Sequence, residues 1–358
     1  MPDLEEEVLA RIERQRKLKA RFRDEHITMA HGAGGKTTHT LVEGLFATAF
    51  SNEALSELGD SAKLDVNGTL LNFTTDGYVV KPLTFPGGCI GELAVHGTIN
   101  DLAVSGARPL CLSTAFVVEE GLNADILREQ VAAMAEASRK AGVPIVTGDT
   151  KVVERGKCDG MYIVSSGVGV RDPGVNLSSA SVKPGDHILV SGTIGDHGTA
   201  IMLARGELEL DADVESDTAS VWPLVEALIN ACGPDLRVMR DPTRGGVATV
   251  LNEIAHDANV GVVLNEEAVP VNGPVRGACE ILGIDPMYVA NEGKMIVVVA
   301  PESSEAALAA LKATPGGENA ALIGKVQDQP EGMVLVKTGF GGTRIMDMLI
   351  GDPLPRIC

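Results

Sequence analysis

The sequence predicts an α/β (α+β) protein with two domains, and three observations carry this prediction. Apolar, β-prone runs alternate with helical stretches along most of the 358 residues, which is enough chain for two domains. Glycine is abundant at 41 residues while aromatic residues make up only 3%, a composition that favours aliphatic cores joined by backbone-driven loops. A stretch rich in Pro, Gly and Ser at 171–186 separates the two halves and predicts a linker.

The changes of composition also suggest the domain boundaries. Residues 1–25 are dominated by charge and have too few apolar positions for a buried face, so they are expected to form a solvated helical extension. An N-terminal domain is expected over 26–170 and a C-terminal α/β domain over 187–338. Residues 339–358 are expected to form a mobile tail.

The predicted elements alternate in both halves, and Asn123 is a candidate N-cap for an amphipathic helix. In the N-terminal half, strands are expected at 27–30, 70–80, 109–118, 144–147 and 162–170, and helices at 37–50, 91–106 and 123–142. In the C-terminal half, strands are expected at 187–191, 260–265, 295–299, 322–326 and 334–337, with helices ending at 205 and 256 and spanning 218–232, 274–282 and 301–314.

Charge and cysteine content exclude several classes of function. The formal net charge of −19 argues against nucleic acid or an anionic membrane as a partner, but local Gly, Lys and metal can still bind ATP. The six cysteines form no CxxC pair and are expected to be reduced thiols of a cytoplasmic protein. There is no apolar run of transmembrane length, and the acidic first residues do not resemble a signal peptide.

Four acidic residues stand out because each lies among glycines or small residues flanked by apolar sequence: Asp60, Asp76, Asp101 and Asp149. Each alone is commonly a turn or cap residue. Together they predict a site for Mg²⁺, which prefers carboxylate oxygens and substrate phosphates. Lys151 follows closely and could bind phosphate, act as a base if desolvated, or simply lie on the surface.

Two glycine-rich segments are candidate phosphate-binding loops. In HGAGGK at 31–36, His31 occupies the position where a P-loop requires glycine, so that motif is not satisfied. The segment could still close over phosphates or form a structural turn. MRDPTRGGV at 239–247 opens a predicted helix, as an anion site or as a capped helix start. The candidate residues are Gly32, Gly34, Gly35, Lys36, Asp241, Thr243, Arg244, Gly245 and Gly246.

Glu292 and Cys358 complete the set of candidates. Glu292 lies in NEGK before an apolar strand, as a general base, an adenine or ribose contact, or a loop carboxylate. Cys358 follows Pro353 and Pro355, which lack an N–H and keep the segment out of sheets and helices. The end is therefore either frayed or a thiol on an arm that enters an active site.

The motifs, in order, resemble those of the HypE family of hydrogenase maturation proteins. They are HGAGGK, TTDG, NDLAVSGA, TGDTKVV, LVSGTIGDHG, RDPTRGGV, ANEGK and terminal PRIC. This family belongs to the ATP-binding superfamily of aminoimidazole-ribonucleotide synthetase, selenophosphate synthetase and thiamine-phosphate kinase. The resemblance covers the chain from about Ile27 to Cys358.

The resemblance implies a two-domain aminoimidazole-ribonucleotide-synthetase-like fold, with N-terminal domains pairing across a homodimer and ATP close to that interface. It implies that the carbamoyltransferase HypF places a carboxamide on the sulfur of Cys358. ATP-dependent dehydration then yields a thiocyanate, whose cyano group passes to iron on the HypC–HypD scaffold for [NiFe] hydrogenase.

The resemblance also implies roles for the candidates. Asp60, Asp76, Asp101 and Asp149 would hold Mg-ATP, and the two glycine-rich segments would contact its phosphates. Asn100 and Thr150, in the ND and GDT motifs, are expected to contact ATP. Lys151 and Glu292 are the expected bases, and Cys358 is the carrier.

Two alternatives differ in their requirements. A related synthetase or kinase of the same superfamily would not need the terminal cysteine, and selenophosphate synthetases usually carry Cys or selenocysteine in the glycine-rich N-terminal segment, where this chain has none. A non-catalytic ATP-binding scaffold would only present its tail to a partner. The full set of carboxylates argues against the scaffold.

Overall fold

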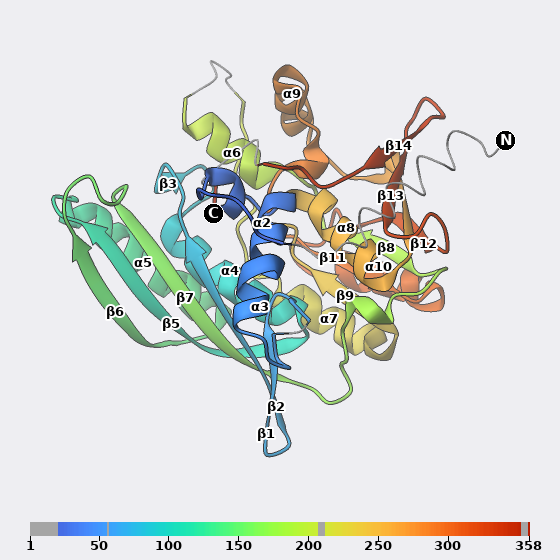
Figure 1. The fold of residues 1–358 in the computed structure, drawn as a ribbon, viewed down its shortest axis with the longest axis horizontal. Coiled ribbons are helices and arrows are strands. Elements are labelled where there is room, and N and C mark those ends of the chain that lie inside the picture. The colour runs from blue at the N-terminus through green and yellow to red at the C-terminus, as the bar shows by residue number, and fades with distance from the viewer. Residues whose placement is uncertain (1–20, 56, 207–211, 352–356) are drawn as a thin grey trace.

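The computed structural model describes residues 21–55, 57–206, 212–351 and 357–358. Two separate sheets, each packed with helices, make up most of this part of the chain (Figure 1). The predicted α/β class is confirmed. The expected helical extension lies outside the described residues except for 21–25, which are not helical.

The N-terminal sheet has five strands in the order β1-β2-β7-β5-β6. All neighbours pair antiparallel except β5 and β6, which run parallel. Side chains alternate between the two faces along each strand, so the register decides which residues share a face. The strands are β1 (Ala62–Val66), β2 (Thr69–Tyr78), β5 (Ala107–Glu119), β6 (Ile145–Val153) and β7 (Met161–Arg171).

Helices α4 (Ile90–Val104) and α5 (Ala124–Ala141) belong to this sheet, and α4 contacts β2, β5 and β7. Almost every residue of α4 is buried, because its small side chains let the sheet, α5 and the C-terminal domain approach it from several sides. Asn123 caps α5 as predicted, accepting the N–H of Asp125. A two-stranded ribbon, β3 (Thr84–Phe85) and β4 (Gly88–Cys89), precedes α4.

The C-terminal sheet has seven strands in the order β14-β13-β10-β12-β8-β11-β9. It is covered on both faces, since Ile188 and Val190 pack in one core with α8 while Leu189 packs in another with α7 and α10. The strands are β8 (His187–Val190), β9 (Leu236–Arg240), β10 (Gly261–Asn265), β11 (Ile296–Val299), β12 (Ala321–Gln327), β13 (Met333–Lys337) and β14 (Thr343–Met346). The helices are α6 (Asp196–Ala204), α7 (Trp222–Cys232), α8 (Gly246–Ala258), α9 (Gly273–Leu282) and α10 (Ser304–Lys312), with short 3-10 turns η3 (Ser179–Ser181), η4 (Gly233–Asp235), η5 (Glu266–Ala268), η6 (Pro286–Tyr288) and η7 (Pro301–Ser303).

Several predicted elements differ from the structure. The strand expected at 27–30 is replaced by a 3-10 turn, η1 (Met29–Gly32). The single helix expected at 37–50 consists of α2 (Lys36–Leu41), a π-helical turn η2 (Val42–Phe46) and α3 (Ala47–Ala49). The strand expected at 144–147 continues as β6 to Val153, because an edge strand with one neighbour tolerates the Gly and Asp in its middle. In the expected tail, β14 pairs with β13.

The last described residues lie inside the molecule. After β14 the chain passes the glycine-rich loop, where the N–H of Lys36 donates to the carbonyl of Leu349 at 2.8 Å. Ile357 is 3% exposed and belongs to a core shared by both domains. The C-terminus accordingly lies near α6 and β3 (Figure 1).

Candidate active site

Three of the four predicted metal-binding aspartates lie together, joined by a fourth carboxylate. Asp76 is in β2, Asp101 is in α4, and Asp60 and Asp241 flank strands β1 and β9. Thr74 Oγ1 lies 2.7 Å from Asp101 Oδ2 and 2.9 Å from the carbonyl oxygen of Asp60. We call Asp60, Asp76, Asp101 and Asp241 the carboxylate cluster.

The pKa values of these carboxyl groups show that they interact electrostatically. Burial raises the pKa of Asp101 well above its ordinary range, and the charges of the other three cluster members raise it further. Burial and the charge of Asp60 raise the pKa of Asp241 to about 8, although Arg240 opposes this. Excess buried negative charge of this kind is what a divalent cation stabilises.

The donor chemistry of the carboxylate cluster therefore fits Mg²⁺. Among the described residues, no three acidic, His or Cys side chains are arranged as a complete metal site. Mg²⁺ does not require one, because it is commonly held by one or two carboxylates together with waters and substrate phosphates.

Arg244 connects the cluster to the chain terminus. Its Nη2 lies 3.8 Å from Asp76 Oδ1, and its Nη1 donates to the carbonyl of Gly32 at 3.3 Å. The charge of Cys358 is the largest influence on the pKa of Arg244 and raises it, as do Asp76 and Glu292, against the effect of burial. Arg244 thus provides a permanent positive charge shared by the cluster, Glu292 and the tail.

Glu292 is a buried carboxylate without a hydrogen-bond partner at Oε1 among the described residues. It is 2% exposed, and burial raises its pKa well above the ordinary range, with added repulsion from Asp217, Asp76 and Asp241. Its backbone is held on both sides, since its N–H donates to Asp217 at 3.1 Å and its carbonyl accepts from Asn100 at 2.7 Å. The backbone of Glu292 is therefore fixed in place, and its unpartnered Oε1 is available for proton transfer.

Asn100 has a structural role that its motif did not indicate. It is 0% exposed, and its Nδ2 donates to the carbonyls of Ala219 and Glu292 while its Oδ1 accepts the N–H of Val221 at 2.8 Å. These bonds use both N–H groups of its amide and one of the two acceptor positions of Oδ1. Asn100 therefore joins α4 to the C-terminal domain and positions Glu292, and its contact with ATP stays a prediction.

The residues predicted from GDTK lie elsewhere. Asp149 in β6 lies opposite Ala115 in β5. Ala115 in turn lies opposite Val164 in β7, and Val164 lies opposite Gly77 in β2. Residues paired in this way point to the same face of a sheet, so Asp149 shares a face with Gly77 and not with Asp76, which points to the other face. Three strand spacings, about 14 Å, also separate it from β2.

Within one chain, Asp149 therefore cannot join the carboxylate cluster. It instead pairs with Lys151 at 2.7 Å, and its side chain is 62% exposed. Lys151 lies on the same face, 69% exposed, while Thr150 points to the other face of the edge strand. Within one chain the structure brings three of the four expected aspartates together with Asp241, and the assignment of Asp149 to the metal site stays a prediction.

The glycine-rich loop packs against the other predicted motif. Gly34 has φ +77°, and an added Cβ would lie 2.7 Å from the Cβ of Arg244. A Cβ on Gly35 would lie 2.2 Å from the carbonyl oxygen of Leu349. Lys36 Nζ bonds Asp347 Oδ2 at 2.6 Å. The loop thus joins Arg244 to the start of the tail, and its closure over phosphates stays a prediction.

The backbone conformation and close packing of the segment TRGGV also require its two glycines. Gly245 and Gly246 have φ +75° and +60°, a region that favours glycine. A Cβ on Gly246 would lie 2.6 Å from the carbonyl oxygen of Met287. The pair therefore permits close packing at the start of α8, where the N–H of Thr243 bonds the carbonyl of Asp241 at 3.0 Å. Phosphate binding at this helix start stays a prediction.

The tail docks in its own subunit. The N–H of Val79, directly after β2, donates to the terminal Cys358 oxygen at 3.0 Å. The ring nitrogen Nε2 of His197 lies 2.6 Å from the carbonyl oxygen of Ile357. Between the two alternatives left open by the sequence, this structure has the thiol-bearing end inside a site and not frayed.

Sequence reasoning missed several residues that shape this site. Arg240 pairs with Asp60 and with Glu253, each at 2.8 Å, and so compensates part of the cluster. Tyr78 is 1% exposed beside Asp76 and Asp101, and burial raises its pKa, with the charges of the two aspartates raising it further. Tyr78 lies two residues after Asp76 on the same strand face, which is a signal that a strand prediction could have used.

Two cavities border these groups. One, of about 620 Å³, is lined by Gly34, Asp60, Lys63, Arg240 and Arg244 among others.

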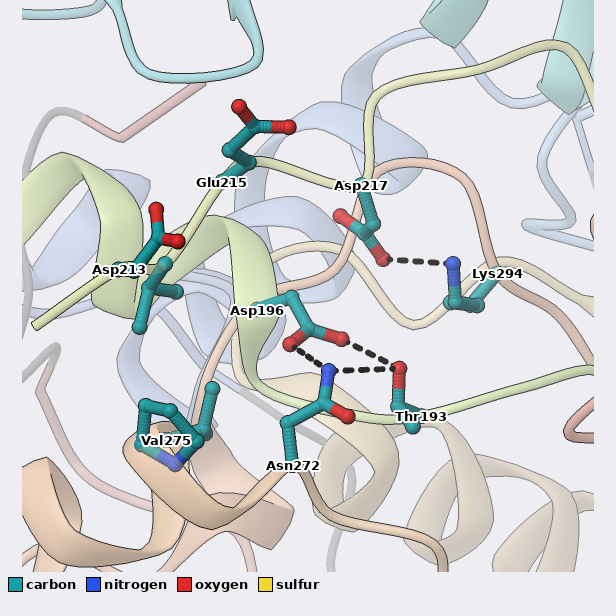
Figure 2. Close-up of a pocket in the computed structure, with 10 residues that line it drawn as sticks. Thr193, Asp196, Asp213, Glu215, Asp217, Asn272, Val275 and Lys294 are labelled. Carbon is teal, nitrogen blue, oxygen red and sulfur yellow. Dashed lines mark hydrogen bonds and ion pairs between the residues drawn. The ribbon is translucent and has the colours of Figure 1, made fainter.

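The second cavity, of about 610 Å³, lies between α6, α9 and the segment at 213–217 (Figure 2). In Figure 2, Asp217 points to Lys294, with Oδ2 3.5 Å from Nζ, while Asn272 bonds Asp196. Asp217 lines this second cavity and accepts the backbone N–H of Glu292 at 3.1 Å.

The raised pKa values predict how stability depends on pH. Asp101, Asp241 and Glu292 bind protons more tightly when folded than when unfolded, so stability should fall as pH rises from about 4 through about 8. The expected slope is about 1.4 kcal/mol per pH unit for each such group. Calorimetry should show the melting temperature falling with pH, a smaller slope in Asp241→Asn, and recovery on adding Mg²⁺. A melting temperature that rises through this window would contradict the arrangement.

Family comparisons agree with the fold. A model of the AIR synthase related protein, N-terminal domain, matches residues 58–171, and a model of the AIR synthase related protein, C-terminal domain, matches residues 183–337. The fold and the site therefore define a protein of the AIR synthase class. None of the described helices has the length and apolarity needed to cross a membrane.

Closer relatives narrow the class. Carbamoyl dehydratase HypE of Rhizobium leguminosarum bv. viciae is 52% identical over 332 residues, covering 93% of this chain and 95% of that protein. A crystal structure of a HypE-HypF complex matches with a TM-score of 0.82 and 48% identity, covering 86% of this chain and 99% of that one. HypE in complex with ATP matches with a TM-score of 0.78 and 48% identity, covering 93% and 100%. The chain belongs to the carbamoyl dehydratase HypE family, which confirms the resemblance seen in its motifs.

Proposed function

We propose that this protein is an ATP-dependent carbamoyl dehydratase that converts an S-carboxamide on its own Cys358 to a thiocyanate. The observation that carries the proposal is the docked tail, which brings Cys358 beside Arg244, Glu292 and the carboxylate cluster. A site that receives its own C-terminal cysteine suits a protein whose substrate is carried on that residue. The names of the HypE relatives and the ATP complex of one of them support the same reaction.

The chemistry requires the loss of one oxygen and two protons from the carboxamide. Oxide is a very poor leaving group, so the amide oxygen first takes the γ-phosphoryl group of ATP and ADP leaves. The C–O bond then breaks, phosphate departs with that oxygen, and a C≡N bond forms. The two protons leave the nitrogen, one retained by phosphate and one released to a base.

The residues of the site suit these steps. Glu292 is the base that takes a proton from the carboxamide nitrogen, since a carboxylate with a raised pKa accepts protons more readily at neutral pH. Arg244 neutralises charge on the phosphoryl group, a main requirement of phosphoryl transfer. Asp60, Asp76 and Asp101 would hold Mg²⁺, which when bound neutralises phosphate charge.

Lys151 requires a second copy of the chain if it is to act here, because it lies on the other face of the N-terminal sheet. That face is apolar and exposed, with Phe73 at 42%, Val164 at 41% and Leu64 at 40%. Exposed apolar patches of this kind commonly mark interfaces. We propose that two copies pair through this face and that Lys151 reaches the partner's site, as a base or as a phosphate ligand.

Phe73→Arg is expected to separate the dimer, because it places a charge in the centre of that apolar face. Light scattering should report a monomer, and dehydration should fall with it. Leu322→Arg is a matched control, since Leu322 is equally exposed at 42% but lies in β12 of the other domain. A Phe73→Arg protein that stays dimeric would contradict the proposed interface.

The proposed partners follow from the family. HypF, which forms a complex with a HypE relative, would supply the carboxamide. The thiocyanate would pass to a HypC–HypD scaffold for the iron of [NiFe] hydrogenase. The protein would work in the cytoplasm with reduced thiols.

The function is tested by intact mass. Protein carbamoylated on Cys358 is mixed with ATP and Mg²⁺, and the proposal expects loss of one water from the C-terminal peptide together with ADP and phosphate. Cys358→Ala should accept no carboxamide and release no coupled phosphate. If the carboxamide persists and phosphate release does not depend on it, the protein is a scaffold or an enzyme of another substrate.

A further inference from the structure

His197 contacts the docked tail but has no part in the chemistry above. It lies in α6, is 0% exposed, and packs edge-on against Phe85 with ring centroids 5.6 Å apart. Its Nε2 is 2.6 Å from the carbonyl oxygen of Ile357 and 3.9 Å from Glu292 Oε1. A buried polar ring between the tail and the proposed base calls for an explanation.

The hydrogen bonds around His197 determine which nitrogen carries the proton. Nδ1 lies 2.8 Å from Ser216 Oγ, and that oxygen already accepts the N–H of Thr218 at 3.2 Å. Nε2 faces the carbonyl oxygen of Ile357, which can only accept, so the ring proton lies on Nε2 and the Ser216 hydroxyl donates to Nδ1. Nε2–H then donates to the carbonyl of Ile357. Burial lowers the pKa of His197, which keeps the ring neutral.

The last two residues of the tail are held by hydrogen bonds from different domains. His197, in the C-terminal domain, bonds the carbonyl of Ile357, while Val79, in the N-terminal domain, bonds the terminal Cys358 oxygen at 3.0 Å. The side chain of Ile357 is buried in the core shared by both domains. One bond would fix a point on the tail, whereas these contacts together fix its depth and direction.

We propose that His197 is a positioning residue that registers the docked tail, so that Cys358 meets Arg244 and Glu292. The purpose that we assign to His197 rests on the proposed function, whereas the docking of the tail does not depend on it. His197 moves no proton in the reaction. Its Nε2–H and the Ile357 pocket set where the sulfur lies.

The test is the rate at which iodoacetamide alkylates Cys358, followed by mass spectrometry of the C-terminal peptide in the full-length protein. Docking leaves Cys358 partly buried, so the rate reports the undocked fraction. His197→Phe keeps a ring against Phe85 but removes the donor. We expect alkylation about 5- to 10-fold faster, as for loss of one buried hydrogen bond, with ATP binding retained. His197→Gln restores an N–H donor and should recover much of the protection.

A second pair of variants covers the case in which the His197 variants do not fold. Ile357→Ala removes the buried side chain of the tail without changing α6, and should also expose Cys358. Ile350→Ala is the matched control, because that side chain is 72% exposed on the same tail, and it should leave the rate unchanged.

Unchanged Cys358 alkylation in both His197→Phe and Ile357→Ala would overturn the inference, as would failure of His197→Gln to restore protection that His197→Phe has lost. The outcome is separate from that of the proposed function. If the wild-type protein does not dehydrate its carboxamide but the alkylation pattern holds, the docking site stands and the reaction is wrong.

Discussion

Glu292→Gln should lower the rate of dehydration by about 10²- to 10⁴-fold, the usual contribution of a general base. Glutamine has nearly the same shape, and both backbone bonds that hold residue 292 remain. Only the ability to take a proton is lost. ATP binding should therefore be nearly unchanged, and the defect should lie in turnover.

The stability of the Glu292→Gln protein distinguishes loss of a general base from a folding defect. Glu292 is buried with a raised pKa, so replacing it with a neutral amide relieves an unfavourable charge at neutral and alkaline pH. The melting temperature should stay the same or rise while activity falls. Glu120→Gln, at an exposed position, is the control. A Glu292→Gln protein that retains most of its rate would remove Glu292 from the mechanism.

The pH profile gives a second view of Glu292. Because burial and three carboxylates raise its pKa, the rate should rise with pH as Glu292 ionises, at higher pH than for an ordinary carboxyl group. In Glu292→Gln this limb should disappear from the profile of the residual activity.

Lys151→Met should reduce dehydration by about 10²-fold or more, whether Lys151 is a base or a phosphate ligand. The side chain is 69% exposed, so the substitution should leave the folding of the monomer unaffected. Its effect depends on the dimer, since Lys151 lies on the sheet face opposite Asp76.

Mixed dimers reveal which subunit Lys151 serves. A Lys151→Met subunit paired with a Glu292→Gln subunit has one site with both residues intact if Lys151 acts across the interface. Such a dimer should recover about half the activity of the wild type, since one of two sites works. If Lys151 acts in its own subunit, both sites are damaged and no activity returns, which would contradict the proposed arrangement.

The sequence allowed the class of fold and most strands and helices to be predicted, because the apolar periodicity was clear. It failed where local signals compete. Residues 148–151 look like a loop because Gly and Asp disfavour strands, yet the pairing of β6 with β5 overrides this. This strand places Asp149 and Lys151 on the sheet face opposite Asp76, which the sequence did not indicate.

The sequence indicated which residues gather at the candidate site better than it indicated what each of them contacts. Asp60, Asp76, Asp101, Arg244, Glu292 and Cys358 are brought together. The ATP role of Asn100 was expected from the resemblance of its ND motif and stays a prediction. Its structural partners lie about 120 or more positions away, and no local pattern could indicate them. His197 was within a quoted motif, but only the path of the tail shows what it contacts.

The central claim is that the carboxamide oxygen on Cys358 leaves as phosphate. It is tested most directly by placing a heavy oxygen isotope in the carboxamide and measuring the phosphate released with ATP and Mg²⁺. The proposed mechanism predicts that the labelled oxygen appears in inorganic phosphate, with one label for each thiocyanate formed. Label released to water, with phosphate unlabelled, would contradict it.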